Sequence, residues 1–530
     1  MWDVLYDHFY DYLGAYMFLA LALTLFTGLP VALAIGGVAL IFGFLGIALD
    51  IIDFREFFIV LPRIWGGDGS SGAVQNPVLV AIPCFIFMGT MLERSRVAAD
   101  LLHILQVMLK RIPGGLAMSV TVMGTIMAAT TGIIGASVVM MTLLALPTML
   151  QQRYQTPLAT GTLAASATLG ILIPPSIMLV LMANLLAVSV GNLFIGAILP
   201  GLVLSGLYMV YLLTISSIKP EWAPPLPDDA IQLQPTRFKL VYIFSGLVGA
   251  QVLGAVVLNQ TALAESVNWG LLAFFGIFAT SMIVGRLEPE SLFGLILRGF
   301  VPPIFLIVLV LGSIFGGWAT PTEAAGVGAF GSIVLALFNG TLNKTVLTDV
   351  VHRTALTTGM IFFIFVGATT FSYIFRALYG EDLIIEFIEW LNLHSWALLF
   401  LLMFVVFLLG FFFDWLEITL IILPVFAPVI KEIAPDFAMH LGMEGAPFAA
   451  VQQQAIYWFA ILVAINLQTS FLTPPFGFAL FYMKGVAPPE VRMQDIYKGI
   501  IPFVGLQLIG LAVVVAFPQV TLWLPRLMLE

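Results

Sequence analysis

Two segments of the sequence place paired prolines inside long apolar runs. The first carries Pro174-Pro175 and the second carries Pro474-Pro475. A proline pair removes two backbone N–H donors and breaks a helix. The half-helix before each break then ends in carbonyl groups that attract cations, and the half-helix after it begins with N–H groups that attract anions. The two segments therefore predict two places where ions meet broken helices.

Hydroxyl side chains precede both breaks. Thr168 lies before the first, and Thr469, Ser470 and Thr473 lie before the second. Their oxygens are hard ligands of the kind that suit Na⁺. The alternative is an ordinary proline kink, in which Ser and Thr bond back to carbonyls of their own helix. We expect at least two Na⁺ ions at the carbonyl ends. On the N–H side we expect substrate contacts, at Ser176, Pro175, Phe476 and Pro475.

Each break has a second segment that interrupts an apolar run. Small residues surround Thr130, Thr131 and Ser137 in the first half, and the counterpart in the second half carries Asp414 and Glu417. Acids at membrane depth are costly and indicate function, here a cation or proton site. Asp414 and Glu417 also have the spacing of a helix-capping pair. Both interpretations of the two acids stay open.

The composition requires a membrane. Of 530 residues, 61% are hydrophobic and 9% are charged, whereas soluble domains are about 25% charged. The net charge of −9 and the absence of a basic patch argue against nucleic-acid binding. A single cysteine excludes an internal disulfide. No phosphate-gripping loop is present, so transport would be driven by an ion gradient.

Charge-free apolar runs near helix-spanning length indicate helices and not barrel strands. The fold class predicted is an all-α polytopic membrane protein. Its segments are first scaffold helices at 14–92, an amphipathic arm at 94–111, a hairpin and broken helix at 113–188, a scaffold helix at 191–217, a linker and extra helical hairpin at 219–297, second scaffold helices at 298–377, a second arm at 381–392, a second hairpin and broken helix at 396–483, and a last helix at 499–525.

The proline landmarks recur in the same order in both halves, which predicts two repeats, each with a re-entrant hairpin and a proline-broken helix. With the N-terminus outside, all but five of the 20 Lys and Arg residues fall on the cytoplasmic side. The five outside are Arg55, Arg63, Arg376, Lys431 and Arg526. The positive-inside rule therefore favours this orientation, in which the two halves have opposite topology. The extra hairpin, 237–285, is expected to be peripheral.

Four segments together resemble the large membrane subunit, DctM, of TRAP (tripartite ATP-independent periplasmic) transporters. They are Met88–Ser95, Gly170–Ser176, Ala319–Ala325 and Leu472–Gly477. The resemblance covers about residues 14–218 and 298–525. An enlarged loop at 50–76 and the extra hairpin depart from it.

The resemblance implies an elevator-type, Na⁺-coupled importer of organic acids in the bacterial inner membrane. The distribution of positive charges predicts that its N-terminus is periplasmic. It implies two partners, a small DctQ-like membrane subunit and a periplasmic DctP-like binding protein, and no enzymatic activity. By motif, the first Na⁺ site takes Thr130, Thr131, Ser137, Thr168, Gly170 and Pro174, and the second takes Asp414, Asn466, Thr469, Ser470 and Thr473.

Three other functions compete with this one. A channel would use rings of ligands around a symmetric pore, and a membrane-embedded enzyme would need a catalytic constellation that the sequence lacks. The third is a self-sufficient Na⁺/anion carrier of the same superfamily, which would need no binding protein.

Overall fold

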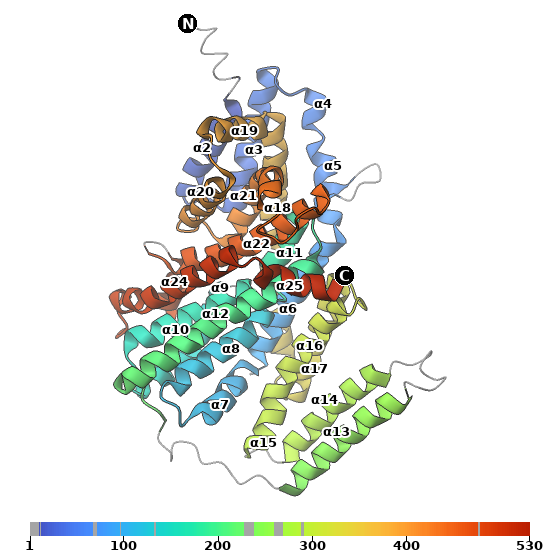
Figure 1. The fold of residues 1–530 in the computed structure, drawn as a ribbon, viewed down its shortest axis with the longest axis vertical. Coiled ribbons are helices and arrows are strands. Elements are labelled where there is room, and N and C mark those ends of the chain that lie inside the picture. Colours follow the sequence, from blue (N-terminus) through green and yellow to red (C-terminus); the bar gives the residue numbers. More distant parts are fainter. Residues whose placement is uncertain are drawn as a thin grey trace.

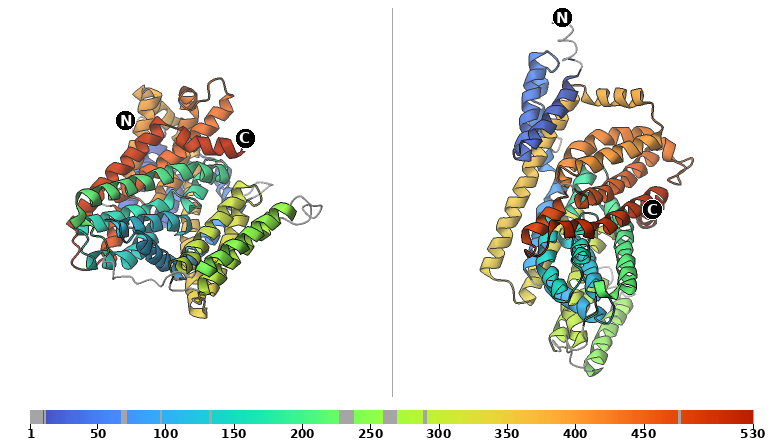
Figure 2. Two further views of the ribbon diagram at one scale, coloured as in Figure 1. Left: turned by 60° about the horizontal axis from the view of Figure 1, so that its bottom comes forward. Right: turned by 90° about the vertical axis from the view of Figure 1, so that its left-hand side faces the viewer.

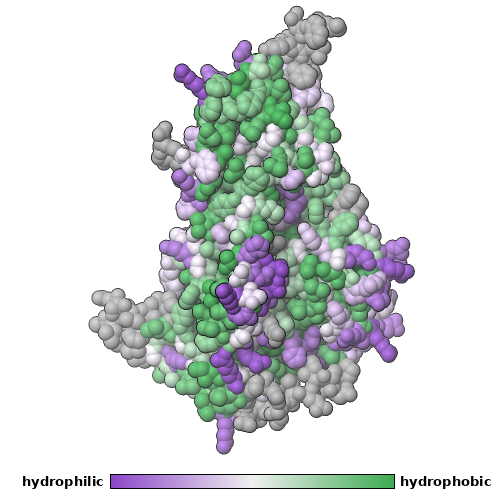
Figure 3. Space-filling model, turned by 180° about the vertical axis from the view of Figure 1, so that it is seen from behind, coloured by the Kyte–Doolittle hydropathy of each residue, from purple (hydrophilic) through white to green (hydrophobic). Residues whose placement is uncertain are grey.

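The computed structural model describes residues 10, 12–66, 72–95, 97–131, 134–226, 238–258, 269–287, 291–474 and 477–529. Ten helices of this part are long and apolar enough to cross a membrane. Apolar side chains cover much of the face seen in Figure 3. The fold is therefore the expected all-α polytopic membrane protein.

The first half runs from α2 to α12 (Figure 1). Its elements are α2 (Leu13–Phe26), α3 (Val31–Ala48), α4 (Phe54–Phe57), α5 (Val60–Trp65), η1 (Ala73–Gln75), η2 (Pro77–Val80), α6 (Ala81–Arg94), α7 (Val97–Leu109), α8 (Gly115–Thr131), α9 (Ile134–Gln151), α10 (Thr156–Thr168), η3 (Leu169–Ile171), α11 (Ile177–Leu185) and α12 (Val190–Ile218). Two helices, α13 (Phe238–Leu258) and α14 (Trp269–Leu287), follow the short η4 (Pro220–Trp222).

The second half runs from α15 to α25. They are α15 (Leu292–Leu295), η6 (Ile296–Phe300), α16 (Val301–Phe315), α17 (Pro321–Phe338), α18 (Lys344–Ala377), α19 (Gly380–Leu391), α20 (Ser395–Leu409), α21 (Trp415–Ile433), η7 (Ala434–Phe437), α22 (Phe448–Leu472), α23 (Phe478–Val486), α24 (Met493–Ala516) and α25 (Gln519–Leu529).

The two broken helices occupy the centre of the molecule. Residues 158–168 of α10 and 455–472 of α22 are all buried. The buried side chains include polar ones, such as Ser166 and Gln468, which would be costly to expose to lipid, so both helices are enclosed by protein. The enclosure comes from the hairpins α8–α9 and α20–α21 and from α12 and α24, which all pack against the broken helices. We call these elements, with α11 and α23, the central group.

A second set of helices forms a frame beside the central group. It consists of α2, α3, α6, α16, α17 and α18, with α3 packed on α18 and α6 packed on α17. Figure 2 shows α18 as a long helix along one side of the molecule, next to α2 and α3. The contacts of the two halves correspond, since α10 packs on α24 as α22 packs on α12, and α9 packs on α23 as α21 packs on α11.

Helix α18 begins at Lys344, where Asn343 caps it and Asp349 and Arg353 form an ion pair one turn apart. Two parts differ from the sequence-based expectation. The last run, 499–525, is divided into α24 and α25 around Pro518, which has no N–H to continue a helix. Also, α12 contacts α8, α22 and α24, so it packs with the central group, whereas the sequence grouped it with the scaffold.

The two arms lie far apart, with α19 near the top and α7 near the bottom of Figure 1. Each arm contacts the first helix of the opposite half, α19 against α2 and α7 against η6 at the start of α16. The extra hairpin is peripheral. None of the residues from Lys239 to Val256 in α13 is buried, and α14 packs onto α15, η6 and α16.

We predict that the two arms lie on opposite sides of the membrane. In a chain with Cys84→Ala, a cysteine at Met108 should react with a membrane-impermeant maleimide only from the cytoplasmic side, and one at Glu386 only from the other side. Both positions are exposed in the structure. Permeabilised membranes, in which both cysteines must react, provide the control. Labelling of both from one side of intact membranes would refute the opposite topology of the halves.

Candidate functional site

The first break follows directly on α10, whose last turn tightens into η3. Ser176 then begins α11, and its hydroxyl donates a hydrogen bond of 2.6 Å to the carbonyl of Ile171. Gly170, Pro174, Pro175 and Ser176 are all buried. The predicted substrate-side residues Pro175 and Ser176 thus lie inside the protein, and the hydroxyl of Ser176 closes the break across its own loop.

The hydroxyls before both breaks bond to carbonyls of their own helices. Thr168 donates to Ala165 at 2.9 Å, Thr469 to Ile465 at 3.2 Å, Ser470 to Leu467 at 2.9 Å and Thr473 to Thr469 at 2.7 Å. A hydroxyl that donates its proton keeps two lone pairs on the oxygen. The bonds therefore satisfy the helix and leave the oxygens able to bind a cation.

The second break contacts the hairpin α20–α21. Gly410, at the end of α20, lies so close to Ser470 that a Cβ atom at Gly410 would overlap the Ser470 hydroxyl. The amide of Asn466 donates a hydrogen bond of 2.6 Å to the carbonyl of Met403 in α20. The structure thus brings Asn466, Ser470 and the hairpin turn together. Pro475 and Phe476 lie outside the described residues.

The first break contacts the hairpin α8–α9 in a similar way. Helix α8 packs on η3, and a Cβ atom at Gly124 of α8 would lie 2.8 Å from the Cβ of Ser166. Thr130 and Thr131 end α8, and only their backbone is described. Ser137 is buried in the first turn of α9. Gly135, at the start of α9, faces the ring of Tyr482 in α23, so the first hairpin also contacts the second broken helix.

Asp414 and Glu417 form a capping box at the start of α21. The Asp414 carboxylate accepts from the Trp415 N–H at 2.8 Å, and the Glu417 carboxylate accepts from the Asp414 N–H at 2.8 Å. Glu417 also borders a cavity of about 70 Å³ between α2 and the hairpin, lined otherwise by apolar side chains. The capping interpretation is thus correct for both acids. It leaves further carboxylate lone pairs of Asp414 for a cation.

Two buried glutamines near the breaks were not predicted from the sequence to be cation ligands. Neither amide atom of the fully buried Gln468 has a hydrogen-bond partner among the described residues. Gln507 of α24 donates a 3.4 Å hydrogen bond to Thr168, and its Oε1 has no partner there. Buried polar atoms without partners are costly. The side-chain amide oxygens of Gln468 and Gln507, which lack a hydrogen-bond partner among the described residues and lie near hydroxyl groups, fit a site for a hard cation such as Na⁺. The sequence feature that could have identified these two residues is a glutamine inside a mostly apolar run.

A polar cleft separates the central group from the frame. It has a volume of about 210 Å³ and is lined by side chains from α5, α11, α18 and α21. Arg63 of α5 and Arg376 of α18 border it, together with Asn184, Thr369 and Ser372. Arg376 pairs with Glu381 at 2.6 Å, and the Arg63 guanidinium lies 4.8 Å from the centre of the Tyr373 ring.

From the sequence, Arg63 and Arg376 were predicted only to be positive charges on the outer side. The signal for a role was that both break the positive-inside pattern. Arg63 is held in the cleft because the enlarged loop folds into α5, with Val60 and Ile64 buried against the frame helix α18. A cleft with two guanidinium groups has the electrostatics to admit a carboxylate.

Comparison with known proteins identifies relatives of this chain. Relatives include the C4-dicarboxylate TRAP transporter large permease protein DctM of Pseudomonas aeruginosa, 26% identical over 85% of this chain and 87% of the relative. The sialic acid TRAP transporter large permease protein SiaM of Vibrio cholerae is 24% identical over 93% and 98%. The YdaH transporter of Alcanivorax borkumensis, a crystal structure described as having an unusual topology, shares the fold with a TM-score of 0.52 at 15% identity, over 88% of this chain and 89% of that one.

The sequence profile of the DctM component of tripartite ATP-independent periplasmic transporters matches residues 18–520. This match confirms the resemblance drawn from the four motifs and spans both broken helices. The chain belongs to the DctM family and is the large permease subunit of a TRAP transporter.

Proposed function

We propose that this subunit couples the entry of Na⁺ to the import of an organic acid anion across the bacterial inner membrane. The observation that carries the proposal is the pairing of a hairpin with a helix break in both halves. η3 packs on α8, and Ser470 packs on Gly410. Each pairing gathers hydroxyl and amide oxygens in a buried place with few charges, which is a setting for a monovalent cation.

Partners complete the proposed cycle. Family membership points to a small membrane subunit and a periplasmic binding protein that delivers the substrate. Relatives are named for C4-dicarboxylate and for sialic acid, both carboxylates. The arginine-lined cleft between central group and frame supports a carboxylate substrate here as well. The substrate would enter from the cleft, and the central group would then move past the frame as an elevator.

The reciprocal packing of the two halves supports the inverted repeat in this proposal. Two related sites of opposite orientation would fill together, and their filling would order the breaks. Sodium would then raise the affinity for substrate, and substrate would raise the affinity for sodium by the same factor. The two breaks would act as one unit because α23 also contacts the first hairpin.

The function is tested by uptake into proteoliposomes that contain both membrane subunits. Uptake should require an inward Na⁺ gradient and added binding protein. Equal uptake in choline would contradict Na⁺ coupling, and full uptake without binding protein would show a self-sufficient carrier.

Thr473→Val should weaken the sodium dependence of uptake. Valine keeps the shape of threonine and removes the one oxygen, at a cost of about 1–3 kcal/mol, or roughly 5- to 150-fold in the Na⁺ concentration for half-maximal uptake. Thr214→Val is a matched control, because Thr214 donates the same 2.7 Å bond to the carbonyl four residues earlier, on the exposed side of α12. An unchanged Na⁺ midpoint in a well-expressed Thr473→Val variant would remove this residue from the site.

Arg63→Gln should raise the KM for the substrate by roughly tenfold or more, because a charge-assisted hydrogen bond to a carboxylate is lost. The Na⁺ midpoint should stay the same at saturating substrate. Arg55→Gln, in the neighbouring α4, removes an equal charge outside the cleft. It therefore controls for the effect of losing one positive charge on the electrostatic potential of this region. If both variants raise KM equally, the cleft has no specific role.

A further inference from the structure

A large polar pocket lies away from the breaks, where the frame meets the extra hairpin. It has a volume of about 640 Å³ and lies between the ends of α6 and α14, η6, and the loop from α17 to α18. Three arginines from three elements line it: Arg94 of α6, Arg286 of α14 and Arg298 of η6. Among the described residues of the lining, Asp100 is the one acid. The lining therefore carries more positive than negative charge.

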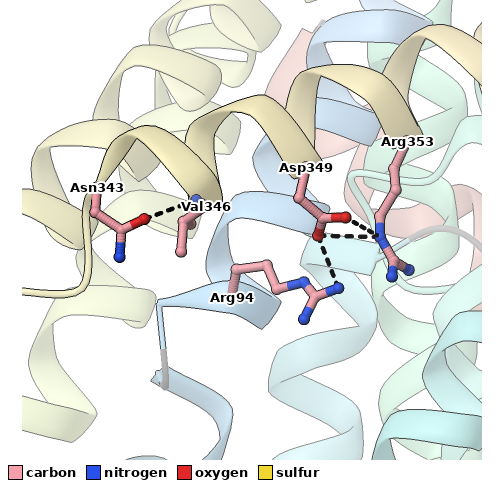
Figure 4. Close-up of polar contacts among 5 residues, drawn as sticks. All are labelled: Arg94, Asn343, Val346, Asp349 and Arg353. Atoms are coloured by element: carbon pink, nitrogen blue, oxygen red, sulfur yellow. Dashed lines mark hydrogen bonds and ion pairs between the residues drawn. The ribbon is translucent and has the colours of Figure 1, made fainter.

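The arginines are only partly neutralised by their neighbours. Arg94 pairs with Asp349 at 2.7 Å, but Asp349 also pairs with Arg353 at 3.1 Å, so two guanidinium groups share one carboxylate (Figure 4). Arg286 donates to the carbonyl of Phe338 and lies over its ring. Neither contact neutralises its charge. Arg298 makes no hydrogen bond or ion pair with another described residue.

The start of α18 adds a further positive field. Asn343 caps this helix by accepting from the Val346 N–H at 2.8 Å, and both residues line the pocket (Figure 4). The first N–H groups of a helix carry a partial positive charge and favour anions nearby. Together with the fork-shaped donors of the arginines, they match the several oxygens of a phosphate group.

Apolar surface leads to the pocket along two helices. On α14, Phe275, Ile283 and Leu287 are exposed, and this helix ends at the pocket with Arg286. On α17, Phe330 and Leu337 are exposed, and this helix ends there with Phe338. A free phosphate ion would gain nothing from these faces, whereas acyl chains would cover them. The occupant that matches both parts is a phospholipid.

We propose that this pocket binds the headgroup of an anionic phospholipid, with its acyl chains along α14 and α17. The lipid would join the extra hairpin to the frame, because its phosphate would bridge Arg286, Arg298 and Arg94. Basic pockets between membrane helices on the cytoplasmic side are a recurring form of lipid recognition. The orientation predicted from the positive charges places the three arginines on that side.

The test uses the full-length protein, delipidated in detergent and titrated with phosphatidylglycerol or phosphatidylcholine, with binding read by native mass spectrometry. Phosphatidylglycerol should bind at least tenfold more tightly than phosphatidylcholine. Arg298→Gln should weaken phosphatidylglycerol binding by about tenfold, because it removes one charged phosphate contact and leaves the ion pairs of Arg94 intact. Arg298→Lys should retain part of the affinity. Arg111→Gln, an exposed arginine outside the pocket, should leave it unchanged.

Three results would overturn the proposal. They are equal binding of the two lipids, equal loss in Arg298→Gln and Arg111→Gln, and displacement of phosphatidylglycerol by inorganic phosphate or glycerol phosphate at a similar concentration. The last result would show a site for free phosphate compounds. None of these measurements depends on transport, so the lipid site and the Na⁺-coupled uptake can fail independently.

Discussion

The structure depends on one constraint: a helix broken at membrane depth has backbone groups without partners, and lipid cannot satisfy them. Two helices here, α10 and α22, end in such breaks. Both helices are deeply enclosed, since residues 158–168 and 455–472 are all buried. The hairpins, α12 and α24 surround them on every side. The rest of the architecture follows from the need to keep these two breaks away from lipid.

Enclosure of the breaks also concentrates oxygen atoms. Thr168, Ser470 and Thr473 donate to carbonyls of their own helices, which lowers the cost of burying them and leaves at least one lone pair on each oxygen available. Gln468 and Gln507 bring amide oxygens without partners among the described residues. This interior is polar but has few charges. Sodium coupling, as proposed, would use an interior that is already required to stabilise the breaks.

Much of the fold could be predicted from the sequence, because prolines and long apolar runs determine the structure of the segment in which they lie. The proline pairs marked both breaks, and the apolar runs marked nearly every long helix. The capping pair Asp414 and Glu417 could also be predicted, since a cap depends on the spacing of nearby residues. The contacts between segments far apart in the sequence could not be predicted. The Arg63 and Arg376 cleft needs the folded loop beside α18, and the packing of α12 in the central group depends on three-dimensional contacts.

The central claim is that a hairpin and a helix break together hold each sodium ion. Equilibrium binding of ²²Na⁺ to the purified complex tests it most directly. The account predicts at least two ions per chain, and one fewer in Gly410→Ala, whose new Cβ would push the hairpin off Ser470. Gly505→Ala, on α24 with open space around it, should keep the full number. No saturable Na⁺ binding, or an unchanged number of ions in a well-folded Gly410→Ala variant, would contradict the claim.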